Sequence, residues 1–178
     1  LITSSAASDV YKRQQLGDGR LLNQLTKKKI IFNFRKNDIL NGGDGAPITP
    51  IFHQLIATQK KIKLPVCILN VGGISNATII KEPIGSLKIF SKDLGPGNCL
   101  IDNWIRKNSN YKFDDKGLFA SRGQCNEIIL EQAQELYNNR VDKNKVSFDI
   151  NDFDISFARG LSLEDGAATL TEFTASII

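Results

Sequence analysis

A carboxylate and a guanidinium group lie three residues apart, directly before a glycine-rich segment, where they could act on a bound substrate. Arg35 and Asp38 precede the segment 41–45. A carboxylate in this position can accept a proton from a hydroxyl group or from water. Arg35 can bind an anionic group of a substrate or orient Asp38. Asp38 is therefore the candidate general base, and the alternative for such an aspartate is a loop cap or a surface charge.

Glycine turns in three polar segments offer backbone N–H groups to a ligand. The first segment supplies the candidates for substrate binding, which are Arg35, Asn41, Gly42 and Gly43. The segments 69–76 and 93–102 supply the candidates for phosphate or nucleotide binding, which are Asn70, Gly72, Gly73, Asn76, Asp93, Gly95, Gly97 and Asn98. A tight glycine turn lets a ligand approach the backbone, and a turn that opens a helix adds the positive end of the helix dipole. Each turn alone is also explained as an ordinary turn, and the chain has no Walker A lysine pattern or dinucleotide fingerprint.

Local patterns predict the elements that would position these residues in the first third of the chain. Three leucines, Leu21, Leu22 and Leu25, share the face of a helix that is expected to end near residue 29. The apolar run 30–34 is typical of a short strand. Thr49 followed by Pro50 predicts a helix start. The apolar face of that helix is expected to be Phe52, Leu55 and Ile56, with His53 packed against a neighbour.

The middle of the chain reads as a hairpin followed by a strand and a helix. A buried strand is expected at 66–71, a turn at Gly72 and Gly73, and a return strand at 74–80. The next strand is expected at 87–90, ending by Asp93, with a break at 95–97. A helix is expected from Asn98, and its core stripe is Leu100, Ile101, Trp104 and Ile105.

Helices are expected to dominate the last third. The segment 125–137 is amphipathic, with Ile128, Ile129, Ala133 and Leu136 predicted to face inward. Ser162 and Asp165 have the spacing of a capping box. A final helix then presents Leu163, Ala167, Leu170 and Ile177 on one side, and it is still running at residue 178.

Composition excludes several classes of protein. The 178 residues are 41% hydrophobic and 24% charged, and no apolar run approaches the roughly 20 residues of a membrane helix. The net charge of +4 is dispersed over short clusters at 27–29 and 60–63, which disfavours a nucleic-acid partner. Three widely spaced cysteines, Cys67, Cys99 and Cys125, match no zinc or disulfide pattern, and the chain has one histidine. We therefore expect a cytoplasmic protein with no membrane partner and no metal held by a histidine cluster.

The first residues have a different character from the rest of the chain. Residues 4–14 resemble a translated sequencing adapter and lack the apolar centre of a signal peptide. The alternative is a natural polar tail. We expect residues 1–14 to be a non-native tail, which also fits a chain that begins with leucine and contains no methionine.

Four motifs follow one another in the chain, and together they resemble the 1,6-anhydro-N-acetylmuramic acid kinase family. They are N-F-R-K-N-D-I-L-N-G-G-D-G-A-P at 33–47, L-N-V-G-G-I-S-N at 69–76, D-L-G-P-G-N-C-L-I-D-N-W at 93–104 and R-G-L-S-L-E-D-G-A-A-T-L-T-E-F-T-A at 159–175. The resemblance covers residues 15–178. It implies an α/β fold, a ribonuclease-H-like lobe of the actin/Hsp70/hexokinase superfamily, truncated at both ends and made mostly of the second lobe.

The resemblance also implies the activity. The family opens the anhydro ring with water and phosphorylates the sugar to N-acetylmuramic acid 6-phosphate in cell-wall recycling, using ATP and Mg²⁺. Asp38 matches the aspartate of the family's F-R-x-x-D motif and would be the base that activates water. The turn at Gly72 and Gly73 would face the phosphates, and residues 93–98 would line the nucleotide or sugar side. Small molecules would be the partners, and the resemblance is compatible with a homodimer of the parent enzyme.

Departures from the family pattern leave a second interpretation open. Many relatives have aspartate where this chain has Asn33, and most have glutamine where it has Asp44. The first difference favours Asp38 as the base, and the second adds a negative charge that could raise the pKa of Asp38. The N-terminal phosphate loop and the adenosine-binding stretch of the family are not in this sequence, so the 178 residues alone are expected to be inactive. The alternative is a non-catalytic ribonuclease-H-like binding or scaffold protein; a Rossmann oxidoreductase lacks its fingerprint.

Overall fold

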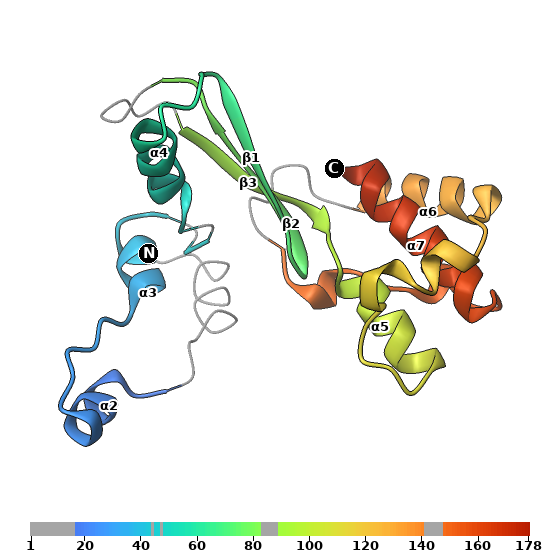
Figure 1. Cartoon of the computed structure of the whole chain (residues 1–178), viewed down its shortest axis with the longest axis horizontal. Helices are drawn as coiled ribbons and strands as arrows, with labels where there is room; N and C mark the ends of the chain where they lie inside the picture. The colour runs from blue at the N-terminus through green and yellow to red at the C-terminus, as the bar shows by residue number, and fades with distance from the viewer. Residues whose placement is uncertain (1–16, 44, 47, 83–88, 141–147) are drawn as a thin grey trace. The chain divides into compact units, whose positions relative to one another are not determined.

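The computed structural model describes residues 17–43, 45–46, 48–82, 89–140 and 148–178. They form two compact units, one within Leu1–Thr49 and one spanning Pro50–Ile178. Figure 1 labels the helices and strands of both units. The adapter-like residues 1–14 lie outside the described part of the chain.

The first unit contains two short helices, α2 (Gly19–Thr26) and α3 (Phe34–Leu40). Helix α2 begins where the Asp18 carboxylate accepts the N–H groups of Arg20 at 2.8 Å and Leu21 at 3.2 Å. It ends at Lys27, whose left-handed backbone (φ 54°) turns its N–H back to the carbonyl of Asn23. The predicted helix is confirmed, and it ends about a turn earlier than expected.

The predicted strand at 30–34 is wrong. Within the described part of the chain, residues 30–33 form no regular secondary structure, and Phe34 begins α3 after Asn33 adopts φ 66°. An apolar run becomes a strand only where a neighbouring strand takes up its backbone hydrogen bonds. Here the ring of Phe32 lies over Gly19 instead. The change matters because it places Arg35 and Asp38 on a helix.

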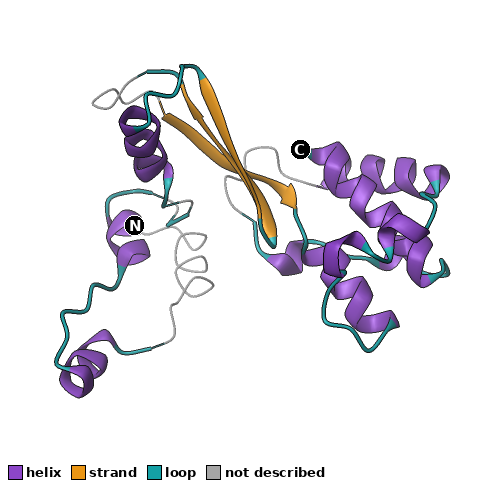
Figure 2. Cartoon of the chain, viewed as in Figure 1, coloured by secondary structure: helices purple, strands orange, loops and turns teal. Residues whose placement is uncertain are grey.

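The second unit is built on a three-stranded antiparallel sheet, which Figure 2 shows in orange. Its strands are β1 (Val66–Val71), β2 (Ile74–Ile80) and β3 (Ile89–Pro96), in the order β1-β2-β3. The predicted hairpin with its turn at Gly72 and Gly73 is confirmed. The part of the third predicted strand before residue 89 lies outside the described residues.

Strand β3 continues past the point where the glycines were expected to break it. Gly95 lies opposite Ser75, and Pro96 lies opposite Ile74. A β-bulge between Ser75 and Asn76 adjusts the register. Proline is tolerated here because β3 is an edge strand of the described sheet, where a missing N–H donor costs little. The predicted break at 95–97 is therefore two residues too early.

Helix α4 (Pro50–Gln59) begins at the predicted proline but buries a different face. Gln54 and Ala57 are buried, whereas Phe52 is 57% exposed and Leu55 is 47% exposed. The prediction failed for these two because polar partners on the sheet decide the orientation. His53 Nδ1 lies 2.9 Å from Thr78 Oγ1 on β2, and the Gln54 amide donates to the Glu82 carbonyl at 3.2 Å. The expected packing role of His53 is confirmed.

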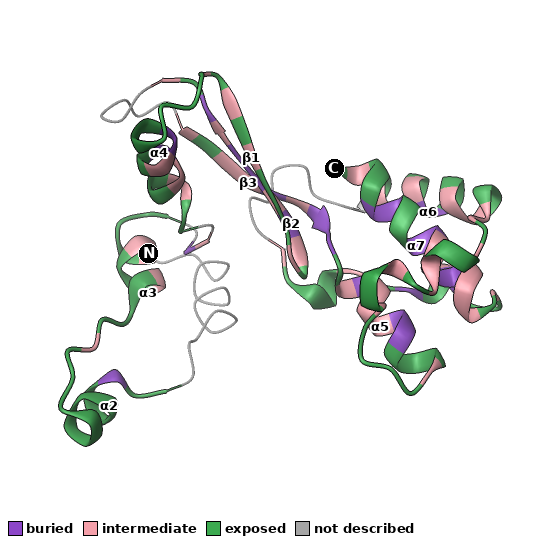
Figure 3. Cartoon of the chain, in the orientation of Figure 1, coloured by how far each residue is buried: buried purple, intermediate pink, exposed green. Residues whose placement is uncertain are grey.

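Three longer helices and several short 3-10 turns follow the sheet. They are α5 (Cys99–Asn108), α6 (Glu127–Arg140) and α7 (Leu163–Ile177), and α7 contacts both others. Figure 3 shows buried segments on α5 and α7, where the apolar core lies. The core is made of Leu100, Trp104, Ile105, Ala133, Ile155, Ala158, Ala167, Leu170 and Phe173.

Most of the predicted helical core is confirmed, Trp104 above all. This side chain is 4% exposed, and its indole N–H donates to the Leu163 carbonyl at 2.9 Å. On α6 the prediction was wrong for Ile128, which is 70% exposed, and for Leu136, which is 46% exposed. The tyrosine of α6, Tyr137, packs on this core instead, next to Phe153 and Phe173.

The start of α7 carries half of the predicted capping box. The hydroxyl of Ser162 accepts the N–H of Asp165 at 3.1 Å. The Asp165 carboxylate accepts the N–H of Gln124 at 2.8 Å and so ties an outside loop to the helix. The fold is thus a mixed one of helices and an antiparallel sheet. None of the helices in the described ranges has the length and apolar character that crossing a membrane requires.

Candidate functional site

Helix α3 brings Arg35 and Asp38 to one peptide of the following loop. The two residues are three apart and share a helix face. The Asp38 carboxylate accepts the N–H of Gly45 at 2.7 Å, and the Arg35 guanidinium donates to the carbonyl of the same residue at 2.7 Å. Gly45 is buried and has φ +70°, a left-handed conformation that glycine adopts without strain. Arg35 and Asp38 therefore fix the loop in one place.

The glycines of this loop allow the carboxylate to lie close beneath it. A Cβ atom on Gly43 would coincide with the Asp38 carboxylate, and Gly42 has φ +86°. The N–H of Gly43 donates to the Asp38 carbonyl at 2.9 Å. Asn41 ends α3, and its amide donates to the Asn37 carbonyl at 2.7 Å. The structure thus groups all of the predicted substrate-binding residues of this segment with Asp38; Asp44 lies outside the described residues.

Asp38 has one oxygen held and one oxygen available. Oδ2 accepts the N–H of Gly45, while Oδ1 has no hydrogen-bond partner within the described part of the chain. The residue is half-buried. A carboxylate that is oriented by one hydrogen bond and keeps a free oxygen has the geometry of a general base.

The glycine turn of the sheet meets the start of α5 in the second unit. The carbonyl of Gly73 accepts the N–H groups of Gly97 at 3.0 Å and Cys99 at 3.2 Å. The carbonyl of Gly72 accepts the N–H of Asn98 at 2.7 Å. The sequence predicted that both segments serve phosphates, and the structure brings them together. These three N–H groups at the start of α5 already donate hydrogen bonds to the turn, so they are not open to a phosphate.

Open backbone in this cluster lies at the tip of the turn. Gly73 is exposed, and a Cβ atom there would meet no described atom within 4 Å. A Cβ atom on Gly97 would instead coincide with the Gly72 carbonyl. A ligand can therefore approach the backbone at Gly73, whereas glycine at 97 is needed for contact between the turn and α5.

The remaining polar candidates lie side by side on the sheet. Asn70 is opposite Asn76, and Asn76 is opposite Asp93, so the three residues form a row across β1, β2 and β3. Asp93 is 8% exposed, and its carboxylate accepts the N–H of Phe148 at 2.8 Å. This carboxylate thus fastens the residues that precede the last helical part. Asn70 is exposed and close to the open turn.

Close packing explains why position 95 is occupied by glycine. A Cβ atom there would lie 2.7 Å from Ile177 and 2.8 Å from the Tyr137 hydroxyl. That hydroxyl donates to the Leu94 carbonyl at 2.6 Å, and burial raises the pKa of Tyr137. Burial likewise raises the pKa of the Cys99 thiol at the start of α5, which keeps it protonated and disfavours a nucleophilic role.

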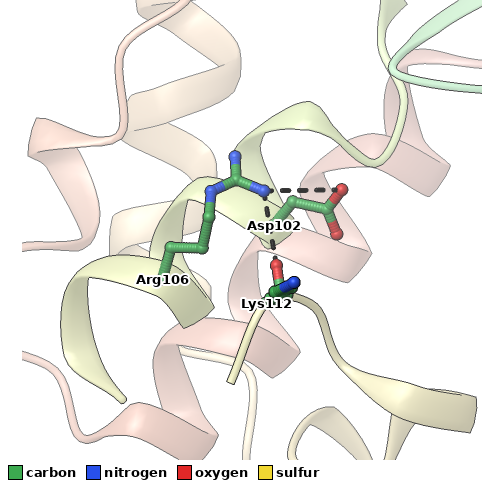
Figure 4. Close-up of polar contacts among 3 residues, drawn as sticks. All are labelled: Asp102, Arg106 and Lys112. Atoms are coloured by element: carbon green, nitrogen blue, oxygen red, sulfur yellow. Dashed lines mark hydrogen bonds and ion pairs between the residues drawn. The ribbon is translucent and has the colours of Figure 1, made fainter. Parts of the chain in front are cut away.

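A pocket of about 560 Å³ lies beside α5, and Asn98 is the one lining residue that the sequence analysis had named as a binding candidate. Figure 4 shows the Arg106 guanidinium between the Asp102 carboxylate, at 4.0 Å, and the Lys112 carbonyl, at 3.3 Å. The pocket is lined by Asn98, Ile101, Asp102, Arg106, Lys112, Phe113, Asp114, Gly117 and Thr171. The four-residue spacing of Asp102 and Arg106 was the one signal in the sequence that they share a helix face.

No group of three or more histidine, cysteine or acidic side chains with metal-binding geometry occurs among the described residues. A magnesium ion that arrives with a nucleotide is held largely by the phosphates and needs only one or two carboxylates from the protein.

Comparison with known proteins identifies the family. The model of the anhydro-N-acetylmuramic acid kinase family matches residues 2–178. An anhydro-N-acetylmuramic acid kinase of Pelagibacter ubique is 51% identical over 166 residues, which is 93% of this chain and 44% of that protein. The same kinase of Zymomonas mobilis is 37% identical over 92% of this chain and 44% of its own length. In Legionella pneumophila the kinase is 41% identical over 66% of this chain and 31% of its own length.

The match to the family model runs through all three candidate segments. The chain spans less than half the length of the curated relatives it matches. A family match over nearly the whole chain, with 51% identity to one relative, agrees with the four motifs and with the order in which they occur. The chain belongs to the anhydro-N-acetylmuramic acid kinase family.

Proposed function

We propose that this chain is part of an ATP-dependent sugar kinase that acts on 1,6-anhydro-N-acetylmuramic acid. Water opens the anhydro ring, and the sugar is phosphorylated to N-acetylmuramic acid 6-phosphate. The observation that carries the proposal is Asp38, which is oriented by the Gly45 N–H and whose Oδ1 has no hydrogen-bond partner among the described residues, in a chain of this kinase family. The partners are the sugar and ATP, not nucleic acid, and the place of action is the cytoplasm.

Asp38 acts as the general base. Its free oxygen takes the proton of the attacking water, while the Gly45 N–H fixes the other oxygen. Arg35 holds the same loop residue through its carbonyl, so it keeps the carboxylate and the loop in register. Gly42 and Gly43 leave the substrate side of the carboxylate unobstructed by side chains. Proton removal by a positioned group of this kind contributes about 10²–10⁴-fold to a rate.

The turn at Gly72 and Gly73 is the phosphate side of the second unit. Support comes from the open backbone at Gly73 and from the neighbouring amide of Asn70. Phosphoryl transfer depends mainly on positioning and charge neutralisation, so backbone N–H groups and a nucleotide-bound magnesium ion are sufficient chemistry on this side. Mg²⁺ supplies the charge that offsets the transferring phosphate.

Residues 15–178 supply the central part of the enzyme, mostly its second ribonuclease-H-like lobe. Three antiparallel strands, the first two joined by the glycine turn and the third followed by a helix, support this assignment. The chain spans 44% of the Pelagibacter relative, so we expect the 178 residues to need the other parts of the enzyme for turnover.

A chimeric enzyme tests the function of these residues. Residues 15–178 replace the matching segment of a full-length curated relative, and the purified protein is incubated with ATP and 1,6-anhydro-N-acetylmuramic acid. We expect N-acetylmuramic acid 6-phosphate, detected by mass spectrometry. A chimera that folds and binds ATP but forms no phosphorylated sugar would contradict the kinase and favour a non-catalytic scaffold protein.

A further inference from the structure

We propose that Thr174 on α7 is a positioning residue for the glycine turn at Gly72 and Gly73, an assignment that rests on the proposed function for the role of this turn in binding phosphates. The side chain is 6% exposed, and its hydroxyl donates to the Gly97 carbonyl at 3.0 Å. The N–H of Gly97 in turn donates to the Gly73 carbonyl at 3.0 Å. Helix α7 is therefore linked to the turn through a single intermediate residue.

The Thr174 hydroxyl differs from the other hydroxyl groups of α7 in what it binds. Those of Thr169, Thr171 and Ser176 donate to carbonyls of their own helix, at 2.7, 2.8 and 2.8 Å. Such a bond to a preceding carbonyl is the ordinary local partner of a serine or threonine inside a helix. Thr174 instead donates to a residue 77 positions away in the chain. Its hydroxyl therefore serves the contact between α7 and the segment that follows β3.

Two further hydroxyl groups hold the same stretch of backbone. The Tyr137 hydroxyl of α6 donates to the Leu94 carbonyl at 2.6 Å, and the Ser75 hydroxyl of β2 donates to the Pro96 carbonyl at 3.4 Å. Side chains from three elements thus bind the carbonyls of residues 94, 96 and 97. The glycines of this stretch have no side chains that could hold it in place. Among the three donors we single out Thr174, because its acceptor residue itself bonds the turn.

The close fit of Gly97 against the turn transmits the effect of this bond. A Cβ atom on Gly97 would coincide with the Gly72 carbonyl and lie 3.0 Å from the Ser75 hydroxyl, so the backbone at 97 touches the turn directly. Removing the Thr174 hydroxyl leaves the buried Gly97 carbonyl without this donor, which favours a shift of the peptide towards another partner. Because Gly97 also bonds Gly73, such a shift changes the backbone at the open tip of the turn.

Steady-state kinetics of the chimeric enzyme with Thr174→Val test the assignment, because valine keeps the shape of threonine and lacks the hydroxyl. We expect the KM for ATP to rise about 3–10-fold, the change in affinity that one hydrogen bond produces, while kcat stays within about twofold. Thr174→Ser keeps the hydroxyl and should restore the parent KM. The matched control Thr169→Val removes another buried hydroxyl of α7, which accepts the N–H of Asn126 at 3.0 Å, and should lower stability without changing the KM for ATP.

The Gly73 amide signal of the ¹⁵N-labelled 178-residue chain tests the link to the turn without catalysis. It should move in Thr174→Val and stay at the parent position in Thr174→Ser and Thr169→Val. An unchanged Gly73 signal in Thr174→Val would overturn the assignment, and so would an unchanged KM for ATP in an active Thr174→Val chimera. An equal rise of this KM in Thr169→Val would also overturn it, since lost helix stability would then be the cause. If the unsubstituted chimera forms no product, the proposed function is contradicted, and the Gly73 signal alone decides whether Thr174 positions the turn.

Discussion

Two glycines in the same contact should differ strongly in how much stability they lose on substitution by alanine. In Gly97→Ala the new Cβ atom would occupy the position of the Gly72 carbonyl, and backbone cannot move aside as a flexible side chain can. In Gly73→Ala the new Cβ atom would meet no described atom within 4 Å, and no left-handed φ makes alanine unfavourable there. The pair therefore compares a filled position with an open one across the same hydrogen bonds.

The cost of Gly97→Ala follows from what must separate. Three hydrogen bonds join the turn to the start of α5, at 2.7, 3.0 and 3.2 Å. A typical hydrogen bond contributes about 0.5–1.5 kcal/mol, and overpacking of a tight site costs about 1–3 kcal/mol. Since separation relieves the clash at the expense of the bonds, we expect a loss of about 2–4 kcal/mol. Gly73→Ala should stay within about 0.5 kcal/mol of the parent chain, as most exposed substitutions do.

Urea unfolding measures both variants. Trp104 is the chain's one tryptophan and lies on α5 in the core, so its fluorescence follows the unit that contains the contact. At a slope of about 2 kcal/mol per molar urea, Gly97→Ala should lower the midpoint by about 1–2 M. Equal midpoints for Gly97→Ala and the parent chain, or an equally large loss in Gly73→Ala, would refute the proposed contact.

Three further substitutions have defined outcomes in the same assay. Tyr137→Phe loses its bond to the β3 backbone and should destabilise by about 1 kcal/mol. Asp165→Asn should be less stable than the parent chain at pH 7. The Gln124 N–H, and after it the Ser162 hydroxyl, lower the pKa of Asp165 in the folded chain. The stability that the carboxylate contributes is therefore complete above its unfolded pKa and disappears as pH falls through the lowered folded pKa. The difference between variant and parent should therefore shrink in acid; a constant difference would contradict this. Gly166→Ala drives a Cβ into the buried Trp104 ring. Overpacking costs about 1–3 kcal/mol and alanine gains about 1 kcal/mol of helix propensity, so a net loss of up to about 2 kcal/mol should remain. Increased stability would show that the ring adapts.

The sequence correctly predicted the elements whose structure is determined by residues within the element itself. The hairpin at 66–80 was predictable because two apolar runs flank a pair of glycines. The starts of α4 and α5 followed from Pro50 and from the residues around Asn98. Each of these signals acts within a few residues of the feature that it determines.

The predictions failed for elements whose structure is determined by contacts with residues far away in the sequence. The run 30–34 looked like a strand, but among the described residues no strand pairs with it. Strand β3 continues through Pro96 because β2 lies beside it. Helix α4 turns His53 and Gln54 inward because Thr78 on the sheet and the Glu82 carbonyl just beyond it provide hydrogen-bond partners. Such pairings join residues 20 to 30 positions apart, which periodicity does not register.

The candidate site was found in its motifs but not in its contacts. The sequence marked Asp38 and the glycine turns, and the structure shows that one peptide, that of Gly45, is held by both Arg35 and Asp38. The sequence did not indicate that glycine is needed at position 97 for the close contact with Gly72. The pocket around Asp102 was also missed, since its lining comes from segments up to about 70 residues apart.

The central claim is that Asp38 is the base of a kinase, and the turnover rate of the chimeric enzyme with Asp38→Asn tests it most directly. Asparagine keeps the shape of the side chain and can still accept the Gly45 N–H, but it cannot take a proton. We predict that kcat for the anhydro sugar falls by about 10²–10⁴-fold while the KM for ATP stays within about twofold. A folded Asp38→Asn chimera that retains the parent kcat would contradict the account.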